Sequence, residues 1–294
     1  MTELRRLLPF EQRFRAWMLA RGMGWGEEEF RCGEQHPAVS YRLRPAGEVK
    51  RVVCAFHGAG NDALFGWIGL FKRLLTGGAE IFTFDLPGHG RGCATSFSGA
   101  SVAEAVAGAI NAGRREDVPL HAVGVSLGGS VLLSQLPRLQ AELTSAALVV
   151  APLQIALSRS SIMNELGMGG LSLVWREREH YGLSGLIPSF GGFKRSIYPL
   201  HLATTPPSGA FGYVEALNLE LRHMELLPAA REVTLPTLLV YGERDEVVPA
   251  SQGEQLAKAM SAARLERIPR GTHLTTPLDR VALDLLVSWL EEEG

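Results

Sequence analysis

Cysteine is scarce in this sequence, with only Cys32, Cys54 and Cys93 among 294 residues. Their odd number and wide spacing match neither a disulfide framework nor the CxxC pairs of redox and metal sites. We therefore expect buried or incidental thiols and no disulfide framework.

Long apolar runs are also lacking. The first 17 residues interrupt their apolar side chains with Glu and Arg, and the charge-free stretch from Leu143 to Ser158 contains Pro152 and several polar residues. A signal peptide needs a core of about 7 to 15 apolar residues, and a membrane-spanning helix needs about 20. The pattern therefore predicts neither export nor stable membrane insertion, and a reducing cytoplasmic location is the default.

Charge of one sign does not dominate either. The chain carries 29 basic and 31 acidic side chains, for a formal net charge of -2, and no long run of one sign. This balance gives no electrostatic case for a nucleic-acid partner. With 46% hydrophobic and 20% charged residues, the composition is that of a globular protein, long enough for one large core. A small, uncharged or weakly charged substrate fits it best.

Helical spacing appears near the start of the chain. Within residues 9–21, Phe10, Phe14, Trp17 and Met18 fall on one face of a helix. Packing on a sheet edge is the expected role of this helix, with membrane or partner binding as the alternative.

Short apolar runs then alternate with helical patterns. They lie at residues 39–43, 51–56, 80–84, 120–125 and 146–151, and the pattern returns at 236–242 and 263–269. Strands that alternate with helices are typical of α/β proteins with a mainly parallel sheet. We therefore predict one such central sheet, flanked by helices.

Residues 152–231 interrupt this alternation. They lack valine-rich strand runs and are rich in Gly, Ser, Met and aromatic residues, with Gly and Pro where chain reversals are expected. We interpret them as a helical cap inserted after the strand near 146–151. The remaining residues, 1–151 and 232–294, would form the core, with an N-terminal helical extension at 1–37.

A possible nucleophile lies between a predicted strand and a predicted helix. Gly124-Val125-Ser126-Leu127-Gly128 follows the strand LHAVGV and precedes SVLLSQLPRL, which is the context of a nucleophile elbow. A serine hydroxyl attacks well only when a tight turn presents it to a base, and glycines on either side permit that turn. The motif predicts Ser126 as nucleophile. A glycine-rich junction that merely packs closely is the alternative.

The same chemistry needs an oxyanion hole, made of two backbone N–H groups that face the developing negative charge. Leu127 supplies one N–H by its position after the serine. The loop that follows the 51–56 strand supplies the second, and Ala59 is the candidate. We expect His57, Gly58 and Gly60 of this loop to border the substrate, with the His57 ring itself holding the loop by hydrogen bonds. A plain turn is the alternative.

An orienting acid and a base should follow the nucleophile, in that order, on loops after late strands. Asp245 in YGERDEVVP follows the 236–242 strand, and His273 in RGTHLTTP follows the 263–269 strand. Glu243 and Glu246 are rivals to Asp245, but their positions on the turn should direct them elsewhere. The other histidines lack an acid and a nucleophile at suitable spacing.

Together these segments resemble the α/β-hydrolases, and more narrowly the cap-bearing branch of monoacylglycerol lipases and serine aminopeptidases. The resemblance spans residues 38–292. It is carried by HGAGN (57–61), FDLPGHGRG (84–92), GVSLGGS (124–130), GERDEVVP (242–249) and GTHLTTP (271–277). It implies an α/β-hydrolase fold and the roles given above for the oxyanion loop, elbow, acid and base. It also implies that no metal or organic cofactor is needed, although the cap matches no subfamily signature.

The expected activity is that of a serine hydrolase of the carboxylesterase or lipase kind, acting on a small acyl substrate through an acyl-enzyme. The resemblance disfavours dehalogenase and epoxide hydrolase chemistry, since those enzymes carry an acid in place of Ser126. Cleavage of amides or carbon-carbon bonds, acyl transfer, and a noncatalytic ligand-binding role are the alternatives. In the cap, the aromatic and methionine side chains suit an acyl chain or the cap's own core, and Arg159, Arg176 and Arg195 could recognise a carboxylate.

Overall fold

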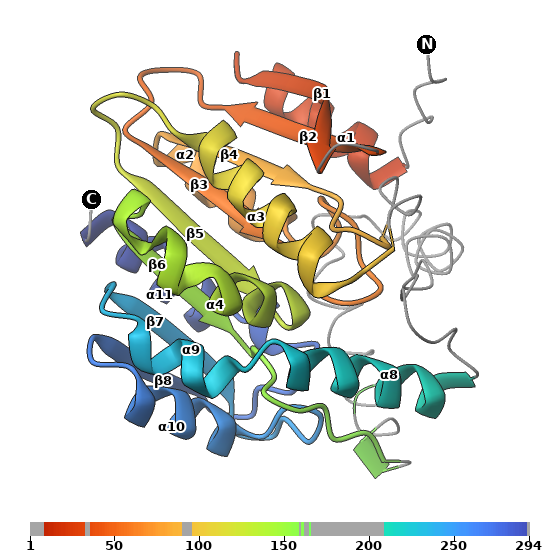
Figure 1. The fold of residues 1–294 in the computed structure, drawn as a ribbon. Helices are drawn as coiled ribbons and strands as arrows, with labels where there is room; N and C mark the ends of the chain where they lie inside the picture. The colour runs from red at the N-terminus through yellow and green to blue at the C-terminus, as the bar shows by residue number, and fades with distance from the viewer. Residues whose placement is uncertain are drawn as a thin grey trace.

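The computed structural model shows helices on both faces of one central sheet (Figure 1). The structure describes residues 9–32, 36–89, 96–158, 160–161, 165 and 209–292. Most of the predicted cap, including Arg159, Arg176 and Arg195, lies outside these residues.

The sheet has eight strands in the order β1-β2-β4-β3-β5-β6-β7-β8. The strands are β1 (Gly24–Cys32), β2 (His36–Arg44), β3 (Arg51–Phe56), β4 (Ala79–Phe84), β5 (Leu120–Val125), β6 (Ser145–Val149), β7 (Thr237–Gly242) and β8 (Ala263–Ile268). Strand β2 pairs antiparallel with β1 and β4, and every other pairing is parallel. The mainly parallel sheet that the sequence predicts is confirmed.

Two helical layers cover the sheet because successive side chains of a strand point to opposite faces. In β3, Val52, Cys54 and Phe56 belong to one buried cluster, and Val53 and Ala55 to another. The first cluster packs under α3 (Gly99–Gly113), α4 (Leu127–Leu139), α8 (Gly209–His223), α9 (Leu226–Glu232) and α10 (Ala250–Ala259). The second packs under α1 (Pro9–Leu19), α2 (Ile68–Thr76) and α11 (Arg280–Glu292). The described residues also contain two short 3-10 turns, Gln140–Glu142 and Thr276–Leu278.

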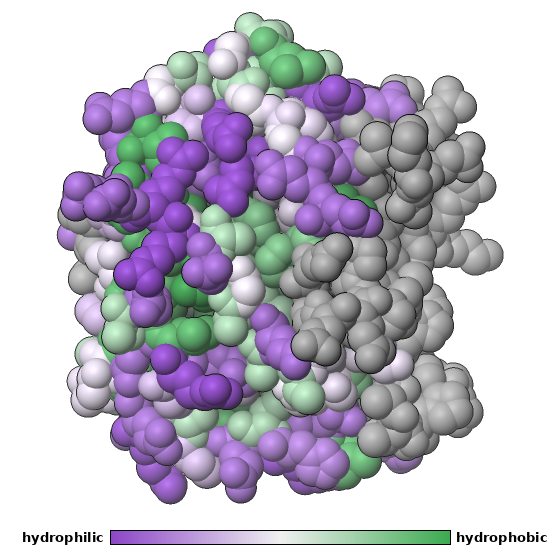
Figure 2. All heavy atoms as spheres, turned by 45° about the horizontal axis from the view of Figure 1, so that its top comes forward, coloured by the Kyte–Doolittle hydropathy of each residue, from purple (hydrophilic) through white to green (hydrophobic). Residues whose placement is uncertain are grey.

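The N-terminal helix packs on the sheet as predicted. Phe10, Phe14 and Met18 of α1 are buried, and the Phe14 ring meets the Trp25 ring of β1 at 5.9 Å between centroids. Among the described residues the exposed large apolar side chains are Leu19, at the end of α1, and Val281. On the face shown in Figure 2, hydrophilic side chains alternate with small apolar areas. The sheet-edge role of α1 is therefore confirmed.

The expectation of a helical extension over residues 1–37 is wrong for Gly24–Cys32, which form strand β1. Its sequence, GWGEEEFRC, lacks the apolar alternation of a half-buried strand. Its two large aromatic residues lie on opposite faces, because Trp25 meets Tyr41 and Phe30 meets Phe84. As an edge strand β1 pairs its backbone with β2 alone, and Glu28 and Glu29 are exposed.

The order of the strands places the site. The chain passes from β3 to β4 on one side, then crosses back to β5 on the other side of β3. In open α/β sheets, ligands bind beyond the carboxyl ends of the strands at such a reversal. The loop with Gly58 follows β3, and Ser126 follows β5. These are the segments in which the sequence predicts the oxyanion hole and the nucleophile.

The predicted break in the sheet also lies where expected, since β6 ends at Val149 and β7 begins at Thr237. The described part of this break contains two helices, α8 and α9. Helix α9 packs against α4 and α10, so the end of the predicted cap segment lies on the core. The division into core and cap stays a prediction.

Candidate active site

Ser126 occupies the turn between β5 and α4 in a strained backbone conformation. Its φ is 51° and its ψ is -124°, a backbone region that residues other than glycine rarely adopt. The turn is held because Ser126 N–H donates to Val149 O at 2.8 Å. Strain of this kind at a strand-to-helix turn is the geometry of a nucleophile elbow.

Close backbone packing explains the glycines of this turn. A Cβ on Gly128 would lie 2.1 Å from Phe56 O, and a Cβ on Gly124 would lie 2.5 Å from Gly128 O. No side chain fits at such distances. The glycines therefore bring α4 against the end of β3, and with it the loop predicted to form the oxyanion hole.

The side chains of Ser126, His273 and Asp245 meet in one chain of hydrogen bonds. Ser126 Oγ lies 2.9 Å from His273 Nε2, and His273 Nδ1 lies 2.9 Å from Asp245 Oδ2. Because a carboxylate can only accept, Nδ1 carries a proton and donates it, which leaves the Nε2 lone pair to accept from the hydroxyl. The structure thus brings together the three residues that the sequence singles out.

The turn after β7 holds the carboxylate of Asp245. Its Oδ1 accepts from the backbone N–H groups of Val247 and Val248, at 2.9 and 2.7 Å. Only Oδ2 is left for the imidazole, which fixes the angle at which the acid meets the base. The two rival acids are exposed: Glu243 and Glu246.

The loop after β3 lies directly against the serine. A Cβ on Gly58 would lie 3.2 Å from Ser126 Cβ, so this loop borders the reacting position. Within the described part of the chain, the N–H groups of Ala59 and Leu127 donate no hydrogen bond. The oxyanion role of these two N–H groups stays a prediction.

The fully buried ring of His57 anchors this loop. Its Nε2 accepts from Leu86 N–H at 2.9 Å, so Nδ1 carries the proton and donates to Gly58 O at 2.8 Å. Burial lowers the pKa of His57 to about 4, against a smaller opposite effect of the Gly58 hydrogen bond. Both ring nitrogens of His57 are hydrogen-bonded to backbone groups, which agrees with the predicted role of the ring in holding the loop. Neither nitrogen is left to bind a substrate.

Sequence comparison decides the family. The model of the alpha/beta hydrolase family matches residues 52–285. The chain belongs to this family. The narrower branch of monoacylglycerol lipases and serine aminopeptidases stays a prediction. No curated protein matches the chain significantly.

Solved structures share the fold of this α/β hydrolase over most of its length. A bacterial membrane phospholipase A is 20% identical, with a TM-score of 0.64, covering 97% of this chain and 91% of its own. The 2-hydroxy-6-oxo-6-phenylhexa-2,4-dienoate hydrolase of Rhodococcus sp. strain RHA1 is 20% identical, with a TM-score of 0.64 and coverages of 92% and 99%. A serine hydrolase of the polyaromatic hydrocarbon-degrading bacterium Cycloclasticus zankles is 14% identical, with the same TM-score and coverages. At these identities the likeness concerns the fold.

One residue of this α/β hydrolase site was not predicted. Glu165, in the segment between β6 and α8, is buried and accepts hydrogen bonds from Thr272, His273 and Leu274. A glutamate in a segment with no recognisable motif gives no local signal of such contacts. Its position therefore had to come from the structure.

The pKa of His273 reflects several opposed effects. Burial of the ring lowers this pKa, whereas the charge of Asp245, its hydrogen bond to Nδ1 and the charge of Glu165 raise it. The raising effects dominate, so the pKa of His273 lies above its ordinary value. The imidazolium that forms when the base takes a proton is thus stabilised by two carboxylates.

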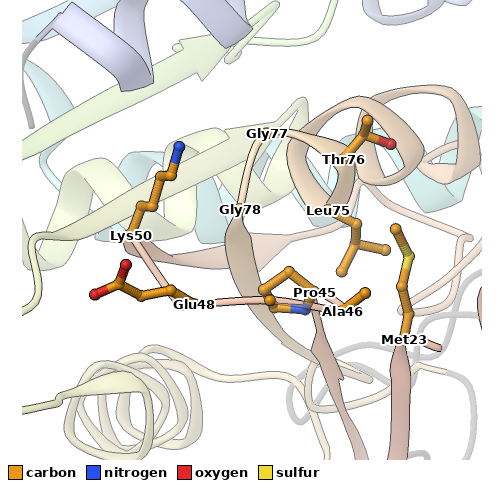
Figure 3. A pocket seen from close by; sticks show the side chains of 10 residues that line it. Met23, Pro45, Ala46, Glu48, Lys50, Leu75, Thr76, Gly77 and Gly78 are labelled. Atoms are coloured by element: carbon orange, nitrogen blue, oxygen red, sulfur yellow. The ribbon is translucent and has the colours of Figure 1, made fainter. Parts of the chain in front are cut away.

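The open hollow in Figure 3 does not belong to this site. It is lined by residues that include Lys50, Gly77 and Gly78, which directly precede β3 and β4. It therefore lies at the amino ends of the parallel strands, whereas Ser126 follows a carboxyl end. The described residues contain no group of His, Cys, Asp and Glu side chains that could hold a metal ion, and no described helix has the length and apolar character to cross a bilayer.

We predict that Gly128→Ala will lower the free energy of unfolding by at least about 3 kcal/mol, because the added Cβ must displace the backbone of Phe56. Urea denaturation followed by circular dichroism measures this. Gly99→Ala is the matched control, since a Cβ there has no neighbour within 4 Å and the position is helical. Equal stability of the two variants would contradict the packing argument.

Proposed function

We propose that this α/β hydrolase is a serine hydrolase that cleaves a carboxylic ester or thioester of a small, largely apolar substrate. The observation that carries the proposal is the pair of hydrogen bonds that links Ser126 Oγ through the His273 ring to the Asp245 carboxylate. Such a hydrogen-bonded triad turns a weak hydroxyl nucleophile into a strong one. The strained backbone of Ser126, which presents the hydroxyl, supports the same conclusion.

In the proposed mechanism, Ser126 Oγ attacks the acyl carbonyl carbon while His273 Nε2 takes the hydroxyl proton. The N–H groups of Ala59 and Leu127 stabilise the oxyanion of the tetrahedral intermediate. The imidazolium then gives its proton to the leaving alcohol or thiol, and the acyl group stays on Ser126. Water, deprotonated by the same nitrogen, attacks the acyl-enzyme and releases the acid.

The substrate class is inferred from charge and from resemblance. Net charge near zero suits an uncharged substrate, and the proteins of similar fold include a phospholipase A. The narrower resemblance to monoacylglycerol lipases points the same way, and we propose that residues 152–231 form the cap that completes the acyl site. Carbon-carbon bond hydrolysis is the second candidate, because the dienoate hydrolase of Rhodococcus shares the fold with an equal TM-score.

A fluorophosphonate probe tests the chemistry independently of the substrate. We expect one probe molecule per chain, and peptide mass spectrometry should place the adduct on Ser126. A panel of p-nitrophenyl esters, acyl thioesters, anilides and a 2-hydroxy-6-oxo-dienoate then tests the class, with short esters expected to turn over fastest. Labelling together with turnover of the dienoate alone would favour the carbon-carbon reaction. No labelling and no turnover would favour a noncatalytic ligand-binding protein.

A further inference from the structure

A second carboxylate reaches the loop that carries His273. Glu165 Oε1 accepts from His273 N–H at 2.8 Å. Its Oε2 accepts from Thr272 Oγ1 at 2.9 Å and from Leu274 N–H at 3.0 Å. Three consecutive residues of the histidine loop therefore donate to one side chain, although 107 to 109 positions of sequence separate them from it.

The burial of Glu165 makes these contacts costly to lose. The residue is only 6% exposed, and a buried carboxylate needs compensating hydrogen bonds or a cation. Among the residues that the structure describes, no Lys or Arg pairs with Glu165. The histidine loop donates three charge-assisted hydrogen bonds to this carboxylate, and such bonds are stronger than those between neutral groups.

His273 is consequently held from two sides by two different segments. Asp245, from the turn after β7, fixes the ring through Nδ1. Glu165 fixes the backbone N–H of the same residue. The described groups that act on the imidazole are then the Ser126 hydroxyl and the two carboxylates, and both carboxylates favour the protonated ring.

We propose that Glu165 is a positioning residue of the reaction, which holds the backbone of His273 for proton transfer and supplies a second negative charge beside the imidazole. This inference rests on the proposed function, because it assigns Glu165 a part in the same proton transfer. A shift of the base by about 1 Å can lower the rate about 10²-fold. Loss of the hydrogen bond from His273 N–H to Glu165 is therefore expected to slow turnover.

Substitution Glu165→Gln tests the proposal, because the amide removes the charge and replaces one of the two acceptor oxygens by an NH2 donor that faces the N–H and O–H groups of the loop. NMR titration of ring-labelled histidine, with the His273 signal assigned by its loss in His273→Gln, reads the pKa without any substrate. We expect a lower pKa of His273 in Glu165→Gln than in the wild type, and a kcat for p-nitrophenyl acetate about 10- to 100-fold lower with KM little changed. Glu243→Gln is the matched control. It removes an exposed carboxylate from the turn after β7, two residues before Asp245, and should alter neither the pKa of His273 nor kcat.

Glu165→Asp separates charge from geometry, and replaces the test if Glu165→Gln does not fold. It keeps the charge but withdraws the carboxylate by one methylene, so we expect kcat to fall while the pKa of His273 stays closer to the wild-type value. An unchanged pKa of His273 in a folded Glu165→Gln variant would overturn the proposal, as would a wild-type kcat in Glu165→Asp. An inactive, unlabelled wild type would overturn the proposed function instead, and the NMR titration would still decide whether Glu165 acts on the imidazole.

Discussion

Substitution Ser126→Ala is expected to lower kcat for p-nitrophenyl ester hydrolysis about 10⁶-fold, without loss of the fold. Alanine keeps the Cβ but removes the oxygen that lies 2.9 Å from His273 Nε2, so no acyl-enzyme can form. The backbone strain at this position is shared by serine and alanine, because both carry a Cβ at the observed φ of 51°. Initial rates and fluorophosphonate labelling measure the loss, and circular dichroism verifies the fold.

Ser134→Ala is the control for this variant. Ser134 lies two turns further along α4, where its hydroxyl donates to Val131 O and accepts from Gln135 Nε2. None of its hydrogen bonds with the described residues reaches the triad. Its loss should leave the rate within about two-fold, as for most substitutions away from a site. Residual activity of Ser126→Ala above a hundredth of the wild type would show that another group attacks the substrate.

The three residues of the proposed triad could be found in the sequence because each follows a strand. Ser126 comes after β5, Asp245 after β7 and His273 after β8. Parallel strands end at the same edge of a sheet, so local signals that are far apart in the chain converge without any knowledge of the fold. The glycines two residues before and after Ser126 gave a second signal, because the tight turn needs them and they fall within a motif of five residues.

Strand β1 and Glu165 could not be found in this way. The strand pairs its backbone with β2, which leaves no pattern in its side chains, and its two packed aromatic residues, Trp25 and Phe30, are too few to give an apolar alternation. Glu165 acts through contacts with Thr272, His273 and Leu274, which depend on the path of a long insertion. Periodicity and turn chemistry report on neighbours in sequence, whereas these two features depend only on neighbours in space.

Substitution Asp245→Asn is expected to lower kcat/KM about 10⁴-fold while the turn keeps its shape. The amide oxygen of asparagine can still accept from Val247 and Val248 N–H, as Oδ1 does now. Its NH2 group then takes the place of Oδ2 and donates to His273 Nδ1, which moves the ring proton to Nε2. A protonated Nε2 faces the Ser126 hydroxyl with a donor instead of a lone pair, so the base cannot accept the proton. Rates of ester hydrolysis and a histidine NMR spectrum that identifies the tautomer test both parts of this expectation.

The rival acids provide the matched controls for Asp245→Asn. Glu243→Gln and Glu246→Gln each remove one negative charge from the same turn, but both side chains are exposed, whereas the Asp245 side chain has no exposed surface. If charge near the histidine were sufficient, all three variants would lose activity to a similar extent. If the hydrogen bond to Nδ1 is what matters, only Asp245→Asn will be strongly impaired, because only Oδ2 of Asp245 lies 2.9 Å from that nitrogen. A larger loss in Glu243→Gln or Glu246→Gln would transfer the role of orienting acid to that glutamate.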